Sequence, residues 1–262
     1  MIILFLGSCA KHKDTTNKDT TNDKPTNKET KLEEKINIPP EIIGTYLNTV
    51  YLDLLNETKS HTVAINKVHR EYKIEIDEII ISEKELLFIL NLHEGAPWNI
   101  VSIDNNIMEF KNHRDEGKII FTDDDLLVYG DVMYRKVTND TDSGPSGEIG
   151  VKTYITSIIF GDKIYRNDNG DALYCLQNGD ILYKNKEYEF TYSYVFENQY
   201  YDKICLIEEE NSWPTKDCWI KMNGDEISVY NIQVPDDYDD IDWAIIGDFI
   251  LVDTLRVFME KE

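Results

Sequence analysis

The residues best suited to binding chemistry form an alternating aromatic run in the second half of the chain. Tyr188, Phe190, Tyr192, Tyr194 and Phe196 occupy every second position, so they would lie on one face of a β-strand. A tyrosine combines an apolar ring with a polar tip, which suits the wall of a cleft for a sugar or a small apolar molecule. The alternative interpretation is that this face is part of the core.

The distribution of the other aromatic residues is consistent with a binding surface in the same region. Eleven of the 16 tyrosines and three of the four tryptophans lie beyond residue 150. We expect Trp219, and with it Trp213 and Trp243, to extend an exposed aromatic platform. The predicted ligand-binding residues are therefore the five aromatic residues of the run together with Trp219.

No catalytic motif is present. The sequence has no G-x-S-x-G, and His93-Glu94 continues into Gly95-Ala96-Pro97, so it does not form H-E-x-x-H. A phosphate-binding glycine loop is also missing. A Ser-His-Asp site could assemble around His61 or His93, but no spacing favours it. The sequence therefore predicts neither an enzyme nor a cofactor.

Clusters of acidic residues suggest calcium ligands, but their spacing favours solvated turns. Calcium needs 6–8 oxygen ligands around one point. None of the clusters has the D-x-[DN]-x-[DN]-G loop with a distant Glu, so no metal site is predicted. The clusters are Asp123–Asp125, Glu208–Glu210 and Asp236–Asp242.

The cysteines suggest one disulfide bond. Cys205 and Cys218 flank a predicted hairpin and lie symmetrically about its centre, which places them within bridging reach if the register is simple. Cys175 would then remain as a buried thiol. No C-x-x-C pair occurs, so neither thiol–disulfide catalysis nor structural zinc has support.

Strong acidity belongs to the folded part of the chain. The formal net charge is −23, and residues 11–35 hold seven lysines and six acidic residues, so residues 36–262 carry a net charge of −24. Such a surface repels nucleic acid and anionic lipid headgroups. Nucleic acid is therefore excluded as a partner.

The amino terminus has the pattern of an export signal followed by a lipidation site. An apolar run, MIILFL, leads into Leu6-Gly7-Ser8-Cys9. These four residues resemble the lipobox of bacterial lipoproteins. The resemblance implies cleavage before Cys9, diacylglycerol on its thiol, and attachment to a membrane through that lipid. The apolar run is shorter than the usual ~7–15 residues, which suggests that translation starts further upstream.

A polar segment follows the predicted lipidation site. Residues 11–35 consist mainly of Lys, Thr, Asn and Asp and cannot bury enough surface to offset their chain entropy. We therefore expect residues 1–8 to be the signal peptide and residues 9–38 to be a flexible lipidated tether. Ala10 directly follows the predicted lipidated cysteine. By resemblance to the lipoproteins of well-studied envelopes, this residue permits sorting of the protein to the outer membrane or cell surface.

The remainder of the chain predicts an all-β fold. Leu47, Val50, Tyr51, Leu54 and Leu55 fall at helical spacing, so one short helix is expected at 47–57. A polar linker at 139–150 precedes an aromatic-rich second β domain at 151–262, in which no long helix is expected. Strands between turn-forming residues are predicted at 72–77, 86–92, 98–103, 107–111, 118–122, 126–129 and 132–137.

Two short motifs at the ends of the segment 39–138 resemble the lipocalin pattern. They are Gly44-Thr45-Tyr46 and Tyr134-Arg135-Lys136. In lipocalins a Gly-x-aromatic motif opens the barrel and a basic side chain of the last strand packs over the aromatic residue. The resemblance implies an eight-stranded antiparallel barrel with a cavity for a small ligand, although Tyr46 stands where the family has Trp. A filled barrel without a cavity is the alternative.

Three functions are consistent with this sequence. The first is a membrane-tethered binding module for a small apolar or sugar-like ligand, which predicts an open pocket lined by aromatic residues. The second is a structural or protein-interaction lipoprotein of the cell envelope, which predicts filled barrels and an exposed apolar patch. The third is a hydrolase, which predicts a histidine and a carboxylate within hydrogen-bond reach in a cleft.

Overall fold

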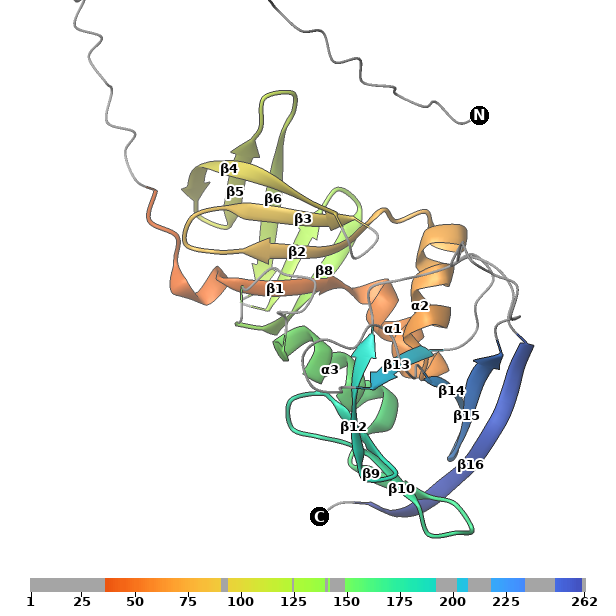
Figure 1. Cartoon of the computed structure of the whole chain (residues 1–262). Coiled ribbons are helices and arrows are strands. Elements are labelled where there is room, and N and C mark those ends of the chain that lie inside the picture. Colours follow the sequence, from red (N-terminus) through yellow and green to blue (C-terminus); the bar gives the residue numbers. More distant parts are fainter. Residues whose placement is uncertain are drawn as a thin grey trace, which may run out of the picture. The chain divides into compact units, whose positions relative to one another are not determined.

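The first eight strands close into an antiparallel barrel in sequence order, because β1 pairs with both β2 and β8 (Figure 1). In this computed structural model the described residues are 36–90, 94–123, 125–139, 141, 149–191, 202–206, 218–233 and 248–260. The strands are β1 (Gly44–Asn48), β2 (Ile76–Ile81), β3 (Leu86–Leu90), β4 (Glu94–Asp104), β5 (Ile107–Lys111), β6 (Glu116–Asp123), β7 (Leu126–Tyr129) and β8 (Val132–Thr138).

Most of the predicted strands of this barrel are confirmed. The bounds of β5 and β7 agree with the sequence prediction, because alternation and flanking turns mark both clearly. The strand predicted at 72–77 is wrong. Tyr72 ends a π-helix, η2 (Val68–Tyr72), and the strand begins only at Ile76. Ile79–Ile81 are buried on both faces, so this strand does not have the alternation on which the prediction relied.

Two α-helices, followed by η2, connect β1 to β2. The predicted helix is present as α1 (Thr49–Thr58), and its N-cap Asn48 accepts a 2.6 Å hydrogen bond from the backbone N–H of Tyr51. The sequence did not predict α2 (His61–Lys67), which is capped by Ser60. Such capping oxygens satisfy donors that a helix start leaves unpaired.

A short 3-10 helix, η1 (Pro40–Ile42), covers one end of the first barrel. Ile42 is buried in the barrel core, and the Tyr46 hydroxyl donates to the Ile42 carbonyl at 2.9 Å. Lys136 on the last strand is the Cα partner of Tyr46, and its Nζ donates to the Glu41 carbonyl at 2.8 Å. A Cβ on Gly44 would clash with the backbone carbonyl oxygen of Thr138 as well as with Cε of Lys136, so only glycine fits at this position. The basic residue therefore holds η1 over the barrel end.

A second antiparallel barrel follows, in which β9 pairs with both β10 and β16. The helix α3 (Ile149–Phe160) precedes it. The strands are β9 (Lys163–Arg166), β10 (Ala172–Cys175), β11 (Ile181–Tyr183), β12 (Lys186–Thr191), β13 (Asp202–Leu206), β14 (Cys218–Asn223), β15 (Glu226–Gln233) and β16 (Asp248–Glu260).

The sequence did not predict α3, and its composition explains why. Its β-branched residues have modest intrinsic helix propensity, and such a composition is typical of a strand. The helix is stabilised by burial: Val151, Ile155 and Ile159 are buried at helical spacing. Lys152 forms a buried 2.8 Å ion pair with Asp180, in the connection between β10 and β11. The helix begins at Ile149, so the last two residues of the linker predicted at 139–150 are helical.

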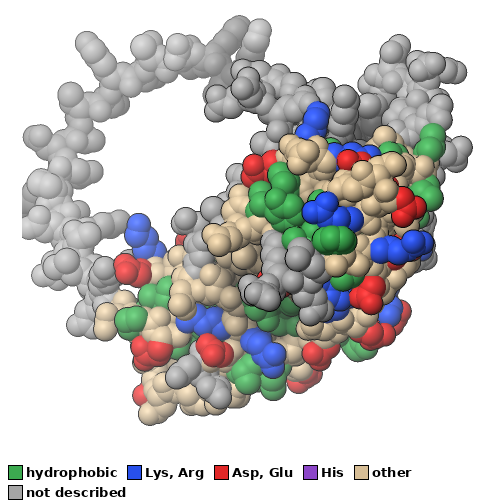
Figure 2. All heavy atoms as spheres, turned by 90° about the horizontal axis from the view of Figure 1, so that it is seen from below, with side chains coloured by type: hydrophobic (Ala, Val, Ile, Leu, Met, Phe, Trp, Pro, Cys, Tyr) green, Lys and Arg blue, Asp and Glu red, His purple; other side chains and the backbone are tan. Residues whose placement is uncertain are grey.

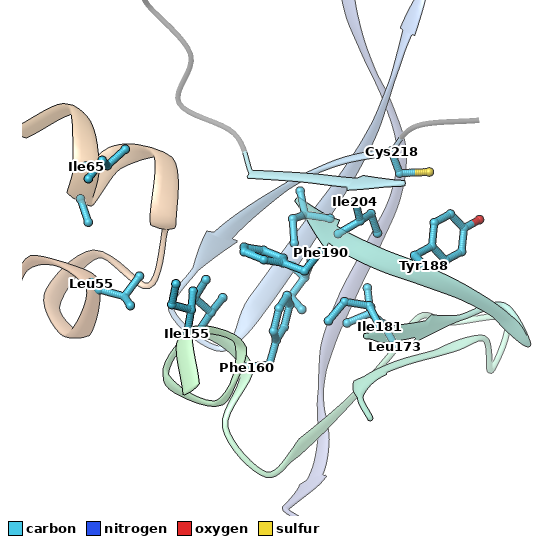
Figure 3. Close-up of a cluster of buried hydrophobic side chains, with 14 of the residues drawn as sticks. Leu55, Ile65, Ile155, Phe160, Leu173, Ile181, Tyr188, Phe190, Ile204 and Cys218 are labelled. Carbon is cyan, nitrogen blue, oxygen red and sulfur yellow. The ribbon is translucent and has the colours of Figure 1, made fainter. Parts of the chain in front are cut away.

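The helices of both segments contribute to the core of the second barrel. Leu55 of α1, Ile65 of α2 and Ile155 of α3 belong to the same buried cluster as Leu173 and Phe190 of the barrel strands (Figure 3). Residues 36–262 accordingly form one compact unit. In the described part of the chain, no helix has the length and apolarity needed to cross a membrane.

Candidate functional site

The described members of the aromatic run face the core of the second barrel. Tyr188 and Phe190 are buried on β12, and the Phe190 ring meets that of Phe160 edge-on at 6.2 Å (Figure 3). Alternate residues of a strand point into a closed barrel, and here α3 fills the space they face. These two residues therefore do not line an open cleft, as the binding prediction required. Tyr192, Tyr194 and Phe196 lie outside the described residues.

Trp219 is not an exposed platform either. It lies on β14 and is buried, with Lys203 and Tyr230 as its Cα partners on the neighbouring strands. Its strand neighbour Ile220 belongs to the barrel core, so the Trp219 ring is on the other face of the sheet. Trp213 and Trp243 lie outside the described residues.

The structure does not join Cys218 to Cys205. Cys218 carries a thiol whose Sγ donates to Oδ1 of Asn231 at 3.7 Å. The register of β13 and β14 pairs Cys218 with Ile204, one residue before Cys205. A disulfide between Cys218 and Cys205 would require the register of the two strands to be displaced by one residue. The sequence prediction assumed a symmetric hairpin, and the register in the structure differs from it. Cys175 is a half-buried thiol. Cys9, the predicted lipidation site, lies outside the described residues.

An aromatic cluster occupies the first barrel at the end opposite η1. Phe110 lies near the end of β5, and Tyr129 is the last residue of β7. The odd-numbered strands all run in the same direction, so these two residues lie away from the start of β1, which η1 covers. The Phe88 and Trp98 rings meet edge-on at 5.7 Å, and Trp98 meets Phe110 at 5.2 Å. Such direct ring contacts fill the barrel with its own side chains.

One polar atom in this cluster has no partner among the described residues. Nε1 of Trp98 is buried, and its N–H makes no hydrogen bond there. A buried donor without an acceptor costs about 1–3 kcal/mol. A bound acceptor group would therefore complete this indole N–H. The sequence placed Trp98 on a strand but gave no sign that its N–H would be buried.

A histidine–carboxylate pair lies at the start of β2. Nε2 of His69, on the π-helix η2, is 2.8 Å from Oδ1 of the buried Asp77. Burial and then the negative charge of Asp77 raise the pKa of Tyr134, whose hydroxyl donates to the Ile76 carbonyl at 3.1 Å. Asp77 orients the imidazole, as the acid of a catalytic triad does.

No nucleophile completes this pair within the described part of the chain. No described serine, threonine or cysteine side chain is hydrogen-bonded to His69. His61, one of the two histidines that the sequence singled out, instead bonds through Nδ1 to the Tyr51 hydroxyl at 2.7 Å. His93 lies outside the described residues. The His69–Asp77 pair therefore ties η2 to β2, and it forms no nucleophile–base–acid arrangement with a residue that the structure describes.

A buried carboxylate ties α2 to the second barrel. Asp202 on β13 accepts a 2.8 Å hydrogen bond from the Thr62 backbone N–H, and further bonds come from Ser60 and His61. Burial raises the pKa of Asp202 to about 6, although these hydrogen bonds favour its ionised form. At neutral pH the junction therefore contains a buried negative charge.

An apolar row crosses the outside of the first barrel. The registers place Ile107 opposite Ile120, Ile120 opposite Val128, and Val128 opposite Met133, on the adjacent strands β5 to β8. Their strand neighbours Met108, Ile119, Leu127 and Tyr134 are buried in the barrel core, so the row faces outward. Ile120 is 39% exposed and Met133 is 43% exposed. We call these four residues the outer apolar row.

Exposed apolar side chains also occur elsewhere on the molecule. On the face seen in Figure 2 they lie among acidic and basic side chains. Val101 in the first barrel and Ile250, Leu251, Val252 and Phe258 on β16 are among the large exposed apolar residues. Scattered exposed residues of this kind are usual, whereas aligned or consecutive ones indicate a contact surface.

We predict that Asp202 gives the protein a specific pH dependence. Its pKa rises from 3.8 to about 6 on folding, so the folded state holds more protons between these values. The contribution of Asp202 to the free energy of unfolding should therefore fall by about 3 kcal/mol as the pH rises from about 3 to about 7. Because asparagine does not titrate, the stability difference between the native chain and Asp202→Asn should change by this amount in urea titrations.

Asp253→Asn provides the matched control for this prediction. Burial works to raise the pKa of Asp253, but hydrogen bonds from Tyr183, Asn167 and Lys184 outweigh it and lower the pKa. The native chain should therefore lose its advantage over Asp253→Asn as the pH falls through the acid range, which is the opposite sign. A pH-independent difference for Asp202→Asn would contradict the assignment.

No protein-family model, curated protein or solved structure matches the chain. What it does is therefore inferred from the contacts, burial and charge of its own residues.

Proposed function

We propose that this chain is a lipid-anchored protein of the bacterial cell envelope that binds another protein through the outside of its first barrel. The outer apolar row carries this proposal. Four apolar side chains lie in register across four adjacent strands, and two of them are more than a third exposed. Aligned exposed apolar residues are typical of protein-interaction surfaces.

The filled interior of the first barrel supports a role for its outer surface. The rings of Phe88, Trp98, Phe110 and Tyr129 contact one another directly, and η1 covers the opposite end. Tyr188 and Phe190, the described residues of the predicted aromatic wall, are core residues of the second barrel. These contacts favour the protein-interaction function over the binding of a small ligand in an open pocket.

The charges beside the row suggest the kind of partner surface that fits it. The pair Glu109 and Lys118 lies along one side of the row, and Arg135 lies along the other. An apolar centre with a charged rim is the usual arrangement of a protein interface. A partner with an apolar ridge and acidic groups opposite Lys118 and Arg135 would complement it.

The amino-terminal motif supports the cellular location. Leu6-Gly7-Ser8-Cys9 resembles a lipobox, and the polar segment after it has the composition of a flexible spacer. In this proposal diacylglycerol on Cys9 holds the protein at the outer membrane or the cell surface. The tether leaves the outer apolar row accessible to a partner in the same envelope.

Cross-linking in cells tests the interaction. A photo-reactive amino acid at Ile120 should give one discrete cross-linked partner, whereas the same residue at Val101, which is 42% exposed but outside the row, should not. Met133→Glu should reduce the cross-link from Ile120 about tenfold, because a charge in an apolar contact costs more than about 1.4 kcal/mol. Equal labelling at both positions, or no effect of Met133→Glu, would rule out this surface.

A small ligand at the aromatic cluster is the second candidate function, and the buried indole N–H of Trp98 favours it. In this case the ligand is a small apolar or sugar-like molecule with a hydrogen-bond acceptor. Native mass spectrometry of the chain purified from its own envelope should then detect a bound mass of a few hundred daltons. Trp98→Phe should lose that mass and Trp219→Phe should keep it. A bare chain in all three proteins would remove this candidate.

A further inference from the structure

The outer apolar row has a defined direction and length. Its four residues are direct Cα partners from strand to strand, so the row runs across β5, β6, β7 and β8 and not along them. Neighbouring strands lie about 4.8 Å apart, so the row is about 14 Å long. Ile120 and Met133, its two most exposed members, are separated by two strand steps, or about 10 Å.

The row is also narrow. The next outward-facing residue is Glu109 on β5, Lys118 on β6 and Arg135 on β8, and all three are exposed. On β7 the half-buried Leu126 lies beside Val128 and adds apolar surface there. The surface is therefore an apolar stripe with charged side chains along both sides.

An α-helix that lies across the four strands fits the spacing of this stripe. Apolar residues of an amphipathic helix recur every three or four positions, which is about 4.5–6 Å along its axis. Successive apolar side chains of such a helix can therefore meet successive members of the row. An extended segment repeats its same-face side chains about every 6.7 Å, so after two strands it would be displaced from the row by about 4 Å.

We propose that the outer apolar row binds an amphipathic α-helix of the partner protein, which lies across β5 to β8. This inference rests on the proposed function, because it specifies the part of the partner that the row contacts. The apolar stripe of the helix covers the row, and its polar flanks reach the charged residues on either side. Recognition of a helix through its apolar face is a recurring mode of protein binding.

The charges beside the row favour acidic flanks on this helix. Lys118 lies along one side and Arg135 along the other, whereas Oε2 of Glu109 already accepts a 3.0 Å hydrogen bond from the Ser102 hydroxyl. Residues 36–262 carry a net charge of −24, so the protein as a whole repels an acidic helix and these two cations attract it. Acidic residues on both sides of its stripe would therefore place the helix on the row.

The spacing of cross-links along the partner tests this inference. A photo-reactive amino acid replaces Ile120 or Met133 in the full-length chain in its own cells, and mass spectrometry identifies the partner residue that each one joins. The 10 Å between the two positions corresponds to about seven residues of a helix but only about three residues of an extended strand. We therefore expect two sites about seven residues apart in one segment of the partner.

Lys118 provides the matched control, because it lies two residues from Ile120 on the same strand and would face the same part of the helix. Its site should lie within about four residues of the Ile120 site. Sites for Ile120 and Met133 that are about three residues apart or fewer, or that lie in different segments, would overturn the helix but leave the protein-interaction function standing. No cross-link from either position would overturn both.

Charge reversal tests the acidic flanks. Arg135→Glu should lower the yield of the Ile120 cross-link about threefold, because it replaces an attraction at the rim with a repulsion. Lys84→Glu makes the same change of charge at an exposed residue between β2 and β3, away from the row, and should leave the yield unchanged. Equal yields from these two variants would overturn the acidic flanks.

Discussion

The shared apolar core beneath the second barrel is the interaction on which the rest of the structure depends. The helices α1 and α2 are inserted between the first two strands of one barrel, yet Leu55 and Ile65 are buried with the core residues of the other. Neither helix is long enough to be stable alone, so packing must supply most of its stability. The same core holds α3, whose sequence has modest helix propensity.

The shared core explains why side chains and helices fill the interiors of the two barrels, and why some apolar side chains remain on their outer surfaces. Three helices and an aromatic cluster occupy the space that an open ligand pocket would need. The apolar residues that remain outside, in the outer apolar row and on β16, have no core to join. They are the features that suggest protein partners, whereas the buried N–H of Trp98 suggests a ligand.

The strands of the first barrel could be predicted because alternation and turn residues act locally. The burial of Tyr188 and Phe190 could not be predicted, because the sequence pattern of an aromatic stripe is the same whether the stripe faces a cleft or a helix. That helix, α3, was itself missed because its β-branched residues resemble a strand. The His69–Asp77 pair depends on a π-helix, for which the sequence has no distinct signal.

Hydrogen exchange of the Leu55→Ala variant tests most directly whether the shared core unites the two barrels. Leu55 is fully buried in α1, so its truncation should cost about 2–5 kcal/mol. If the core is shared, protection of the most stable amides should fall by the same free energy in β1–β8 and in β9–β16. Loss of protection confined to one barrel would contradict the account, because it would mean that the two barrels unfold independently.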